Sequence, residues 1–289
     1  MPVVVRAPAP PLAGLVQSLV YRSGEQPQRS VEKILPGPDT GLWVNLNRDA
    51  FRSFDEAGRP SQVGGAMLAG PASRASVIEF EQGHAHVCVM FALGAASRFV
   101  AAPLALARDE MVPLEELWGA PGASLRERLL EASTPTDALA VTEAILLGQL
   151  TGADTPDPAV VAAARALSRG TRVGEVPAGA RSQGVRVGEV AADLGLLPRT
   201  LRRRFTAAVG LTPKRFARVQ RMQRLVRDLD GQRDADWAAL AAWHGYADQS
   251  HLADEFRELA GVTPGEYLRS RVNGPNHLRA TEHESGLGA

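Results

Sequence analysis

The chain has 289 residues, enough for two domains, and its 45% hydrophobic and 22% charged residues are typical of a globular protein. Its single cysteine, Cys88, excludes an internal disulfide and a cysteine-rich zinc site. No apolar run approaches the roughly 18 residues of a membrane span. The N-terminus also lacks the pattern of a signal peptide, so we expect a cytoplasmic protein without a membrane partner.

The zero net charge conceals two regions of opposite sign. Residues 1–158 carry 12 Lys+Arg against 18 Asp+Glu, whereas residues 159–273 carry 19 against 12. Such an asymmetry is expected when only one domain binds nucleic acid. Lys33 and Lys214 are the only lysines, and arginine can bind phosphates and guanine edges with two parallel bonds. A GC-rich genome would produce the same preference for arginine.

Short strands separated by Gly, Pro or Ser are predicted in the N-terminal region. Residues 12–21 are apolar enough for a short strand or helix. Five further segments favour strands, namely 31–35, 42–46, 67–69, 76–80 and 85–91. Strands at this spacing predict a small barrel or sandwich.

Two helices follow at 124–133 and 136–150, where leucines recur at helical spacing. This pair either packs on the barrel or forms a dimer seam. The polar, proline-containing segment 151–158 is the predicted linker, so the first domain is placed at residues 1–153.

The sequence RVGEV occurs twice in the next region, at 172–176 and at 186–190. Residues 159–167 precede it as an Ala- and Val-rich helix. Only the second copy continues into another apolar pattern, AADLG, so we interpret the first copy as inserted loop. A binding role for that copy is the alternative.

Two segments, 187–210 and 236–261, repeat one pattern. In each, a short apolar helix ends at a glycine, Gly195 or Gly245, and a second helix carries a Leu and a Phe on one face. The pairs are Leu201 with Phe205 and Leu252 with Phe256. Each second helix ends at a glycine followed by Thr-Pro, which suits a left-handed cap and the start of another helix. The repeat predicts two helix-turn-helix units.

A helix that enters the major groove of DNA buries one face and exposes polar side chains near its N-terminus. The predicted DNA-contacting residues are Arg199, Thr200, Arg202, Arg203, Gln249, Ser250, His251 and Asp254. Arg204 lies between the two faces and is expected to contact a phosphate or a neighbouring acid. For His251, a structural hydrogen bond within the turn is the alternative to DNA contact.

Residues 213–229 form one predicted helix of roughly 25 Å between the two units. Such a rod can hold two reading helices about one DNA turn, roughly 34 Å, apart. Phosphate contacts are expected among the arginines spaced along it, Arg215, Arg218, Arg221 and Arg224.

Residues 187–271 resemble the DNA-binding domain of the AraC/XylS family of bacterial transcription regulators. VAADLGLLPRTLRRRF with VGLTPKRF, and LAAWHGYADQSHLADEFRELAGVTPGEYL, carry the resemblance. It implies a domain at residues 159–272 that binds double-stranded promoter DNA, with RNA polymerase as a further partner. Asp254 departs from the family, which often has a basic residue there, and this weakens or retunes the grip of the second unit.

The first 150 residues resemble more faintly the N-terminal sensor-like domain of one AraC subgroup. The similar segments are PPLAGLVQSLVYR, VEKILPGPDTGLWVNL and FVAAPLALARDEMVPLEELWG. That domain is similar to a cupin-like β-barrel, and the resemblance implies a small-molecule effector or a homodimer. The expected fold is therefore α+β: a cupin-like barrel with C-terminal helices, followed by an all-α domain. Residues 273–289 are predicted to be a disordered tail.

An enzyme is the main alternative, because His84 and His86 form a His-x-His pair like the metal-binding pairs of cupins. Two histidines are too few for a metal site, and no third ligand follows them closely. Cys88 lies on an alternating apolar strand and is predicted to be buried. The sequence therefore predicts no catalytic residue, metal or cofactor, against the alternative of a metal-dependent enzyme fused to a DNA-binding domain. A regulator without a ligand, controlled by its abundance, is a third hypothesis.

Overall fold

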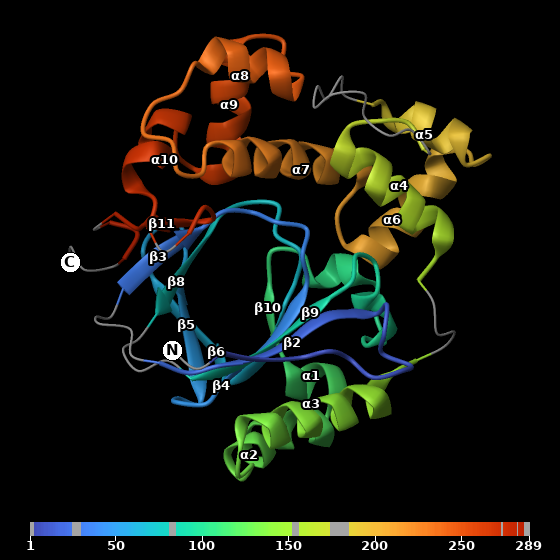
Figure 1. Cartoon of the computed structure of the whole chain (residues 1–289), viewed down its shortest axis with the longest axis vertical. Helices are drawn as coiled ribbons and strands as arrows, with labels where there is room; N and C mark the ends of the chain where they lie inside the picture. The colour runs from blue at the N-terminus through green and yellow to red at the C-terminus, as the bar shows by residue number, and fades with distance from the viewer. Residues whose placement is uncertain are drawn as a thin grey trace.

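The computed structural model describes residues 3–24, 30–80, 85–151, 156–173, 185–272, 274–281 and 283–285. Antiparallel strands form two sheets in the N-terminal half, and helices form most of the C-terminal half. Figure 1 shows helix α7 crossing above the sheets, with helices gathered at both of its ends. The predicted α+β class is therefore confirmed. Within the described residues, no helix is long and apolar enough to cross a membrane.

The first sheet has six antiparallel strands, and it carries the larger hydrophobic core. Its order is β1 (Val3–Arg6), β2 (Val16–Arg22), β9 (His86–Phe91), β4 (Gly41–Asn45), β7 (Ala66–Ala69) and β10 (Met111–Pro113). Strand β9 pairs with both β2 and β4, and five of its six residues are buried. Such burial on both faces is expected of a central strand rich in Val and Phe.

The second sheet has five strands, and its last strand comes from the far end of the chain. Its order is β11 (His277–Arg279), β3 (Ser30–Ile34), β8 (Ser76–Phe80), β5 (Ala50–Phe54) and β6 (Pro60–Gly64). In β11, His277 pairs with Ile34 and Arg279 with Glu32. The C-terminal segment thus completes a sheet that the N-terminal half begins.

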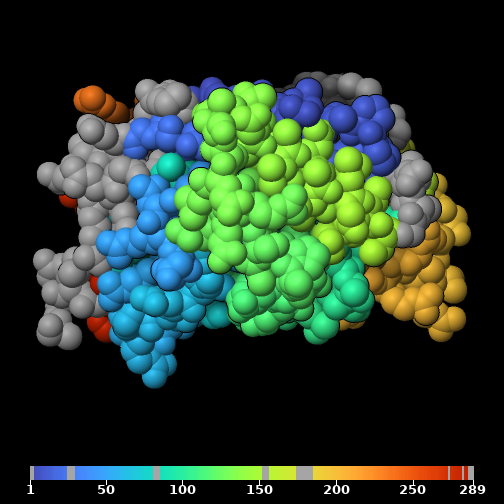
Figure 2. All heavy atoms as spheres, turned by 90° about the horizontal axis from the view of Figure 1, so that it is seen from below, coloured from blue at the N-terminus to red at the C-terminus, as the bar shows by residue number. Residues whose placement is uncertain are grey.

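Short helical segments and a helical pair follow the strands. They are η1 (Ala96–Arg98), η2 (Leu104–Ala107), α1 (Leu114–Trp118), α2 (Ala120–Leu130) and α3 (Pro135–Gln149). Leu125 of α2 and Leu139 of α3 join the hydrophobic cluster that contains Leu19 and Leu42 of the six-stranded sheet. Figure 2 shows this helical segment covering the underside of the molecule. Of the two predicted roles for the pair, the structure shows packing on the sheet.

Seven helices of the described chain form the C-terminal region. They are α4 (Pro158–Arg169), α5 (Val187–Asp193), α6 (Pro198–Val209), α7 (Pro213–Asp228), α8 (Trp237–His244), α9 (Gln249–Ala260) and α10 (Pro264–Ser270). Helix α7 contributes to two cores: Phe216 packs in the cluster of α4, α5 and α6, whereas Met222 and Val226 pack in the cluster of α8, α9 and α10. The predicted rod is therefore shared by both helix-turn-helix units.

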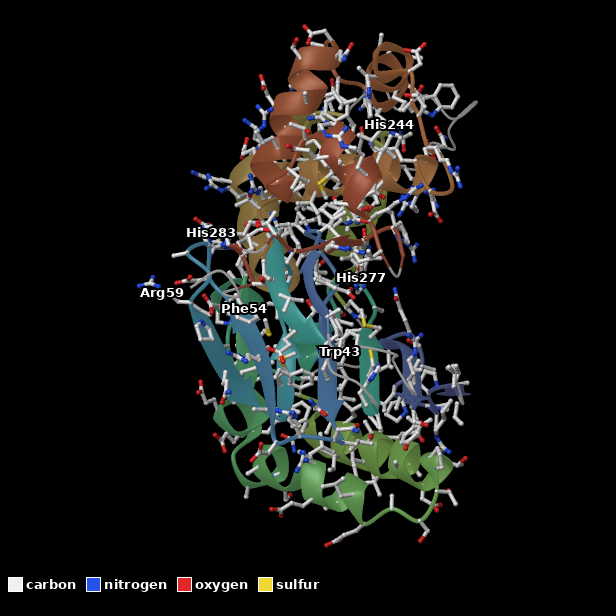
Figure 3. All side chains as sticks on the ribbon, turned by 90° about the vertical axis from the view of Figure 1, so that its left-hand side faces the viewer. Trp43, Phe54, Arg59, His244, His277 and His283 are labelled. Carbon is white, nitrogen blue, oxygen red and sulfur yellow. The ribbon has the colours of Figure 1, made fainter. Side chains whose placement is uncertain are left out.

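Part of the segment predicted to be a disordered tail lies within the described residues, and there it forms strand β11. Leu278 of β11 is only 1% exposed and packs in the same cluster as Leu35, Phe256 and Tyr267. Figure 3 shows His277 at the junction between the sheets and the helices. Composition suggested disorder because this segment is polar and short. One apolar side chain and a sheet edge that needs hydrogen-bond partners are enough to order it.

Candidate nucleic-acid interface

The first helix-turn-helix unit consists of α5, a turn through Gly195, and α6. Gly195 has φ +64°, a left-handed conformation that favours glycine, and it lets the chain reverse direction between the helices. Leu201 and Phe205 of α6 are fully buried, so they form the inner face as predicted. Helix α6 begins at Pro198 and ends at Gly210, whose φ is +82°.

The second unit repeats this construction with α8, Gly245 and α9. The side chain of Asp248 accepts a hydrogen bond from the backbone N–H of His251 (2.8 Å), so it caps α9. Leu252 and Phe256 are fully buried. The Thr-Pro after each unit also has its predicted role, because Thr212 and Thr263 cap α7 and α10.

The eight predicted DNA-contacting residues lie on α6 and α9, mostly at the surface. Thr200 is half-buried, and the other seven are exposed: Arg199, Arg202, Arg203, Gln249, Ser250, His251 and Asp254. Within the described part of the chain, no carboxylate forms an ion pair with the guanidinium groups of Arg199, Arg202 or Arg203. These three cations are therefore available to an external anion.

His251 has a structural role and still keeps one polar atom for a ligand. Its Nδ1 accepts a hydrogen bond from the backbone N–H of Ala247 (3.1 Å), and its ring lies edge-on to Tyr246. In the neutral ring the proton is then assigned to Nε2, which is a hydrogen-bond donor. Of the two predicted roles, the turn contact is observed, and Nε2 remains a candidate for DNA contact.

Of the two partners predicted for Arg204, a phosphate or a neighbouring acid, the structure shows a carboxylate. Its Nε and Nη2 donate to the two carboxylate oxygens of Asp157 at 2.7 and 2.6 Å. Asp157 also caps α4, since it accepts from the N–H of Ala159. This bidentate pair ties α6 to the start of the helical region.

Four arginines of α7 have partners within the protein, and the prediction that some of them contact phosphates stays a prediction. Nε of Arg218 and Nε of Arg221 donate to Glu255 at 2.8 and 2.9 Å. Arg215 donates to Glu258 at 2.7 Å. Arg224, the fourth, donates to the carbonyl of Ser168, and burial lowers its pKa to about 10. Helix α7 thus uses its basic face to hold α9 and α4.

The charge of this network is balanced locally. The Glu255 side chain is 5% exposed, and both of its arginines reach it from α7. Hydrogen bonds from Arg218, and then from Arg215, lower the pKa of Glu258 to about 2. The guanidinium of Arg221 also stacks on the ring of Tyr246 at 4.4 Å. The sequence did not predict this network, although Arg215, Arg218 and Arg221 recur every three residues, so that each lies beside the next on the helix surface.

A groove of about 710 Å³ lies along α7 between the two units. Arg186 and Lys214 line it on the side of the first unit, and His251 and Asp254 line it on the side of the second. The two walls therefore differ in charge. An extended polyanion in this groove would meet Arg186 and Lys214 on the side of the first unit.

The first RVGEV copy lies only partly within the described residues, since 174–184 are outside them. Its Arg172 pairs with Asp193 at the end of α5, and the hydrogen bonds from Arg172 lower the pKa of Asp193. Val173 also donates its N–H to Asp193 (3.2 Å). The described part of this copy therefore supports the first unit.

Two of the residues that suggested an enzyme, His86 and Cys88, lie on β9 of the six-stranded sheet. His84 is outside the described residues, and the buried ring of His86 packs against Trp43, with 5.5 Å between centroids. The residues that the structure does describe contain no group of three metal-binding side chains. Cys88 is buried as predicted, and burial raises the pKa of its thiol to about 12.

The geometry defines a protein with two helix-turn-helix units on one shared helix. Residues 190–270 match a family model described as a helix-turn-helix domain, and residues 5–113 match a domain of unknown function, DUF6597. No curated protein matches the chain. Residues 190–270 of this chain are therefore similar to that helix-turn-helix domain.

Solved structures of ToxT from Vibrio cholerae have a loosely similar fold. One, at 1.65 Å resolution, has a TM-score of 0.46 at 12% identity over 87% of this chain and 98% of that chain. Another, ToxT bound to (E)-4-(8-methylnaphthalen-1-yl)but-3-enoic acid, has a TM-score of 0.47 at 11% identity, with the same coverage.

Proposed function

We propose that this protein is a transcription regulator that binds double-stranded promoter DNA through α6 and α9. The observation that carries the proposal is the pair of helix-turn-helix units built on the two ends of α7. At 1.5 Å per residue, its 16 residues span about 24 Å, which suits two reading helices in successive major grooves. Each reading helix buries a Leu and a Phe and exposes polar residues at its N-terminal end.

The two units differ in charge, and we infer that they divide the work of recognition. The first presents the three exposed arginines Arg199, Arg202 and Arg203, which suit phosphates and guanine edges. The second presents Gln249, Ser250, His251 and Asp254, which are neutral or acidic and suit base edges rather than phosphates. The first unit then supplies most of the electrostatic affinity.

Arg202→Ala and Arg203→Ala are each expected to weaken specific DNA binding by about 1–3 kcal/mol if the side chain reaches a base. Binding is measured by fluorescence anisotropy on a recovered target site. Arg128→Ala is the matched control, because this exposed arginine lies on α2, outside both helix-turn-helix units. Unchanged binding in both α6 variants would exclude α6 as a reading helix.

Affinity is expected to fall steeply with salt, because each phosphate contact releases counterions. An α6 arginine that contacts only phosphate should reduce the slope of log Kd against log salt by about 1 when it is replaced by alanine. Titrations of the wild-type protein and the two α6 variants over a series of salt concentrations measure this slope. A flat dependence in the wild-type protein would contradict a DNA partner.

The proposal is tested most directly by recovering the DNA that the tagged full-length protein binds across the genome and aligning the sites. A shared motif with two blocks about one helical turn apart is expected. No enrichment with the full-length chain, or with the fragment from residue 159 onward, would overturn the proposal. Enrichment with the fragment alone would indicate that the full-length protein needs an absent ligand.

The proposed division of labour assigns residues 1–153 to sensing or dimerisation and residues 159–272 to DNA binding. The contact between the N-terminal region and the helical region supports this assignment, since Leu35 packs in the core of the second unit. Gln223 of α7 also donates to the carbonyl of Pro36 at 2.7 Å. A partner that changes this contact would alter the placement of the reading helices. The candidate partners are a small-molecule effector, a second copy of the chain and RNA polymerase.

A further inference from the structure

The loop between β7 and β8, residues 71–75, touches the first unit and α7. A Cβ added at Gly210, the end of α6, would lie 2.4 Å from Cγ of Pro71. Only a glycine with its positive φ therefore allows α6 to end this close to the loop. Two residues along, the carbonyl of Ser73 accepts a hydrogen bond from Nη2 of Arg215 at 2.6 Å.

The same loop also touches the second unit. The backbone N–H of Ala75 donates to the carbonyl of Leu259, near the C-terminal end of α9, at 3.1 Å. Leu259 is fully buried in the core of the second unit, so its carbonyl is fixed by packing. Five consecutive residues thus contact the C-terminal ends of both reading helices and the start of the helix between them.

Asp109, which lies far from both units in sequence, holds this loop in place. Its carboxylate accepts hydrogen bonds from the backbone N–H and the hydroxyl of Ser73, the second at 2.7 Å, and from the N–H of Arg74 at 3.3 Å. Its own N–H donates to the carbonyl of Pro71 at 3.1 Å. Asp109 has φ +62°, a conformation that aspartate adopts more readily than most residues other than glycine.

We propose that residues 71–75 fix the separation of the two reading helices and that Asp109 is a positioning residue for DNA recognition. This inference rests on the proposed function, and it concerns which half-site spacing the protein accepts. Helix α7 contacts each unit on its own side, through apolar packing and through the pairs of Arg218 and Arg221 with Glu255. The loop adds a connection on the side of the sheets that reaches both units at once, so the two units become the ends of a closed frame.

A closed frame affects the preference for one half-site spacing more than it affects the affinity for the best site. Two units held at one separation bind well only to half-sites at the matching spacing, and their affinity is lower at any other spacing. A loosened frame lets each unit follow its own half-site. Loss of the brace should therefore flatten the spacing preference more than it weakens binding to the best site.

The test is in vitro selection by the full-length protein from duplex DNA with about 40 randomised base pairs, enough for two half-sites one or two helical turns apart. Asp109→Gly removes the carboxylate and keeps a residue that tolerates the positive φ. Ser73→Ala removes one hydrogen bond without touching position 109. Glu56→Ala is the matched control, because Glu56 pairs with Arg74 of the same loop but is itself exposed.

The wild-type protein and Glu56→Ala are expected to select one dominant spacing. For Asp109→Gly, the ratio of affinities for that spacing and for a spacing 2 base pairs longer should fall about tenfold, with Ser73→Ala intermediate. An unchanged ratio in both variants, with a thermal midpoint like that of the wild type, would overturn the role of Asp109. A uniform loss of affinity at every spacing would overturn it too, since it marks a merely structural role. No enriched motif with the wild-type protein would instead overturn the proposed function, and the inference with it.

Discussion

Glu255→Ala is expected to lower the free energy of unfolding by about 3 kcal/mol, because it leaves two partly buried arginines without their carboxylate. The Glu255 side chain is 5% exposed, and those of Arg218 and Arg221 are 23% and 19% exposed. The value lies at the low end for a broken buried pair, since Arg218 keeps Glu258, and Arg221 keeps Tyr246 and the carbonyl of Gly245.

Urea denaturation of the full-length chain measures this loss. Glu258→Ala is the matched control: its carboxylate contacts the same helix, but it is 53% exposed, so removing it should cost less than about 1 kcal/mol. Glu255→Gln keeps the shape and two hydrogen-bonding atoms, and should fall between the two. Equal effects of the two alanine variants would show that burial of the pair does not matter.

The same change is expected to reduce DNA binding through the second unit. Glu255 is the connection by which α7 orients α9, since its two arginines come from successive turns of α7. Without it, α9 keeps its apolar packing and the more exposed pairs of Glu258, but it loses the buried polar contact that helps to fix its rotation about that core. A hydrophobic interface alone is less specific in orientation than one with bidentate charge pairs.

The sequence predicted the two units well because their signals are local. Gly195 and Gly245 mark the turns, Gly210 and Gly261 end the second helices, and Thr-Pro begins the next ones; each acts within a few residues of its own position. The buried Leu/Phe pairs follow from helical spacing alone. None of these features depends on the rest of the fold, so they can be recognised in one sequence.

The strands were predicted only in part, because an exposed strand has few apolar residues to mark it in the sequence. Strands β3, β4, β7, β8 and β9 overlap segments predicted from their apolar residues, whereas β1, β5, β6 and β10 were not predicted. In β6, four of five residues are exposed, because this strand lies at the edge of its sheet. Edge strands need little apolar sequence, so composition does not distinguish them from loops.

The roles of the α7 arginines could not be read from the sequence, because their partners come from another helix. Arg218 and Glu255 are 37 residues apart, and their pairing depends on how α9 packs across α7. Arg204 was predicted to contact a phosphate or an acid, and only the fold selects Asp157. An arginine on a helix surface looks the same in sequence whether it meets DNA or a carboxylate.

Leu278→Ala is expected to destabilise the protein by about 3 kcal/mol, the range for a buried leucine that leaves a cavity. Leu278 is 1% exposed and lies between the second unit and the five-stranded sheet, in one cluster with Leu35 and Tyr267. Its strand continues the sheet through β3, and the hydroxyl of Tyr267 donates to the carbonyl of Pro275 at 2.9 Å. The side chain therefore joins the tail, the sheet and the DNA-binding region.

Urea denaturation and hydrogen exchange of the same variant show whether the tail strand holds the helical region on the sheet or behaves as a disordered segment. Loss of stability with faster exchange at residues 30–34 and 277–279 would show that the tail strand holds the helical region on the sheet. Arg279→Ala is the control, because this neighbouring residue of the same strand is exposed and should change stability by less than about 0.5 kcal/mol. If both variants unfolded like the wild type, the tail would behave as the disordered segment that its composition suggests. The contact of Leu35 with the second unit would then have to hold the helical region without it.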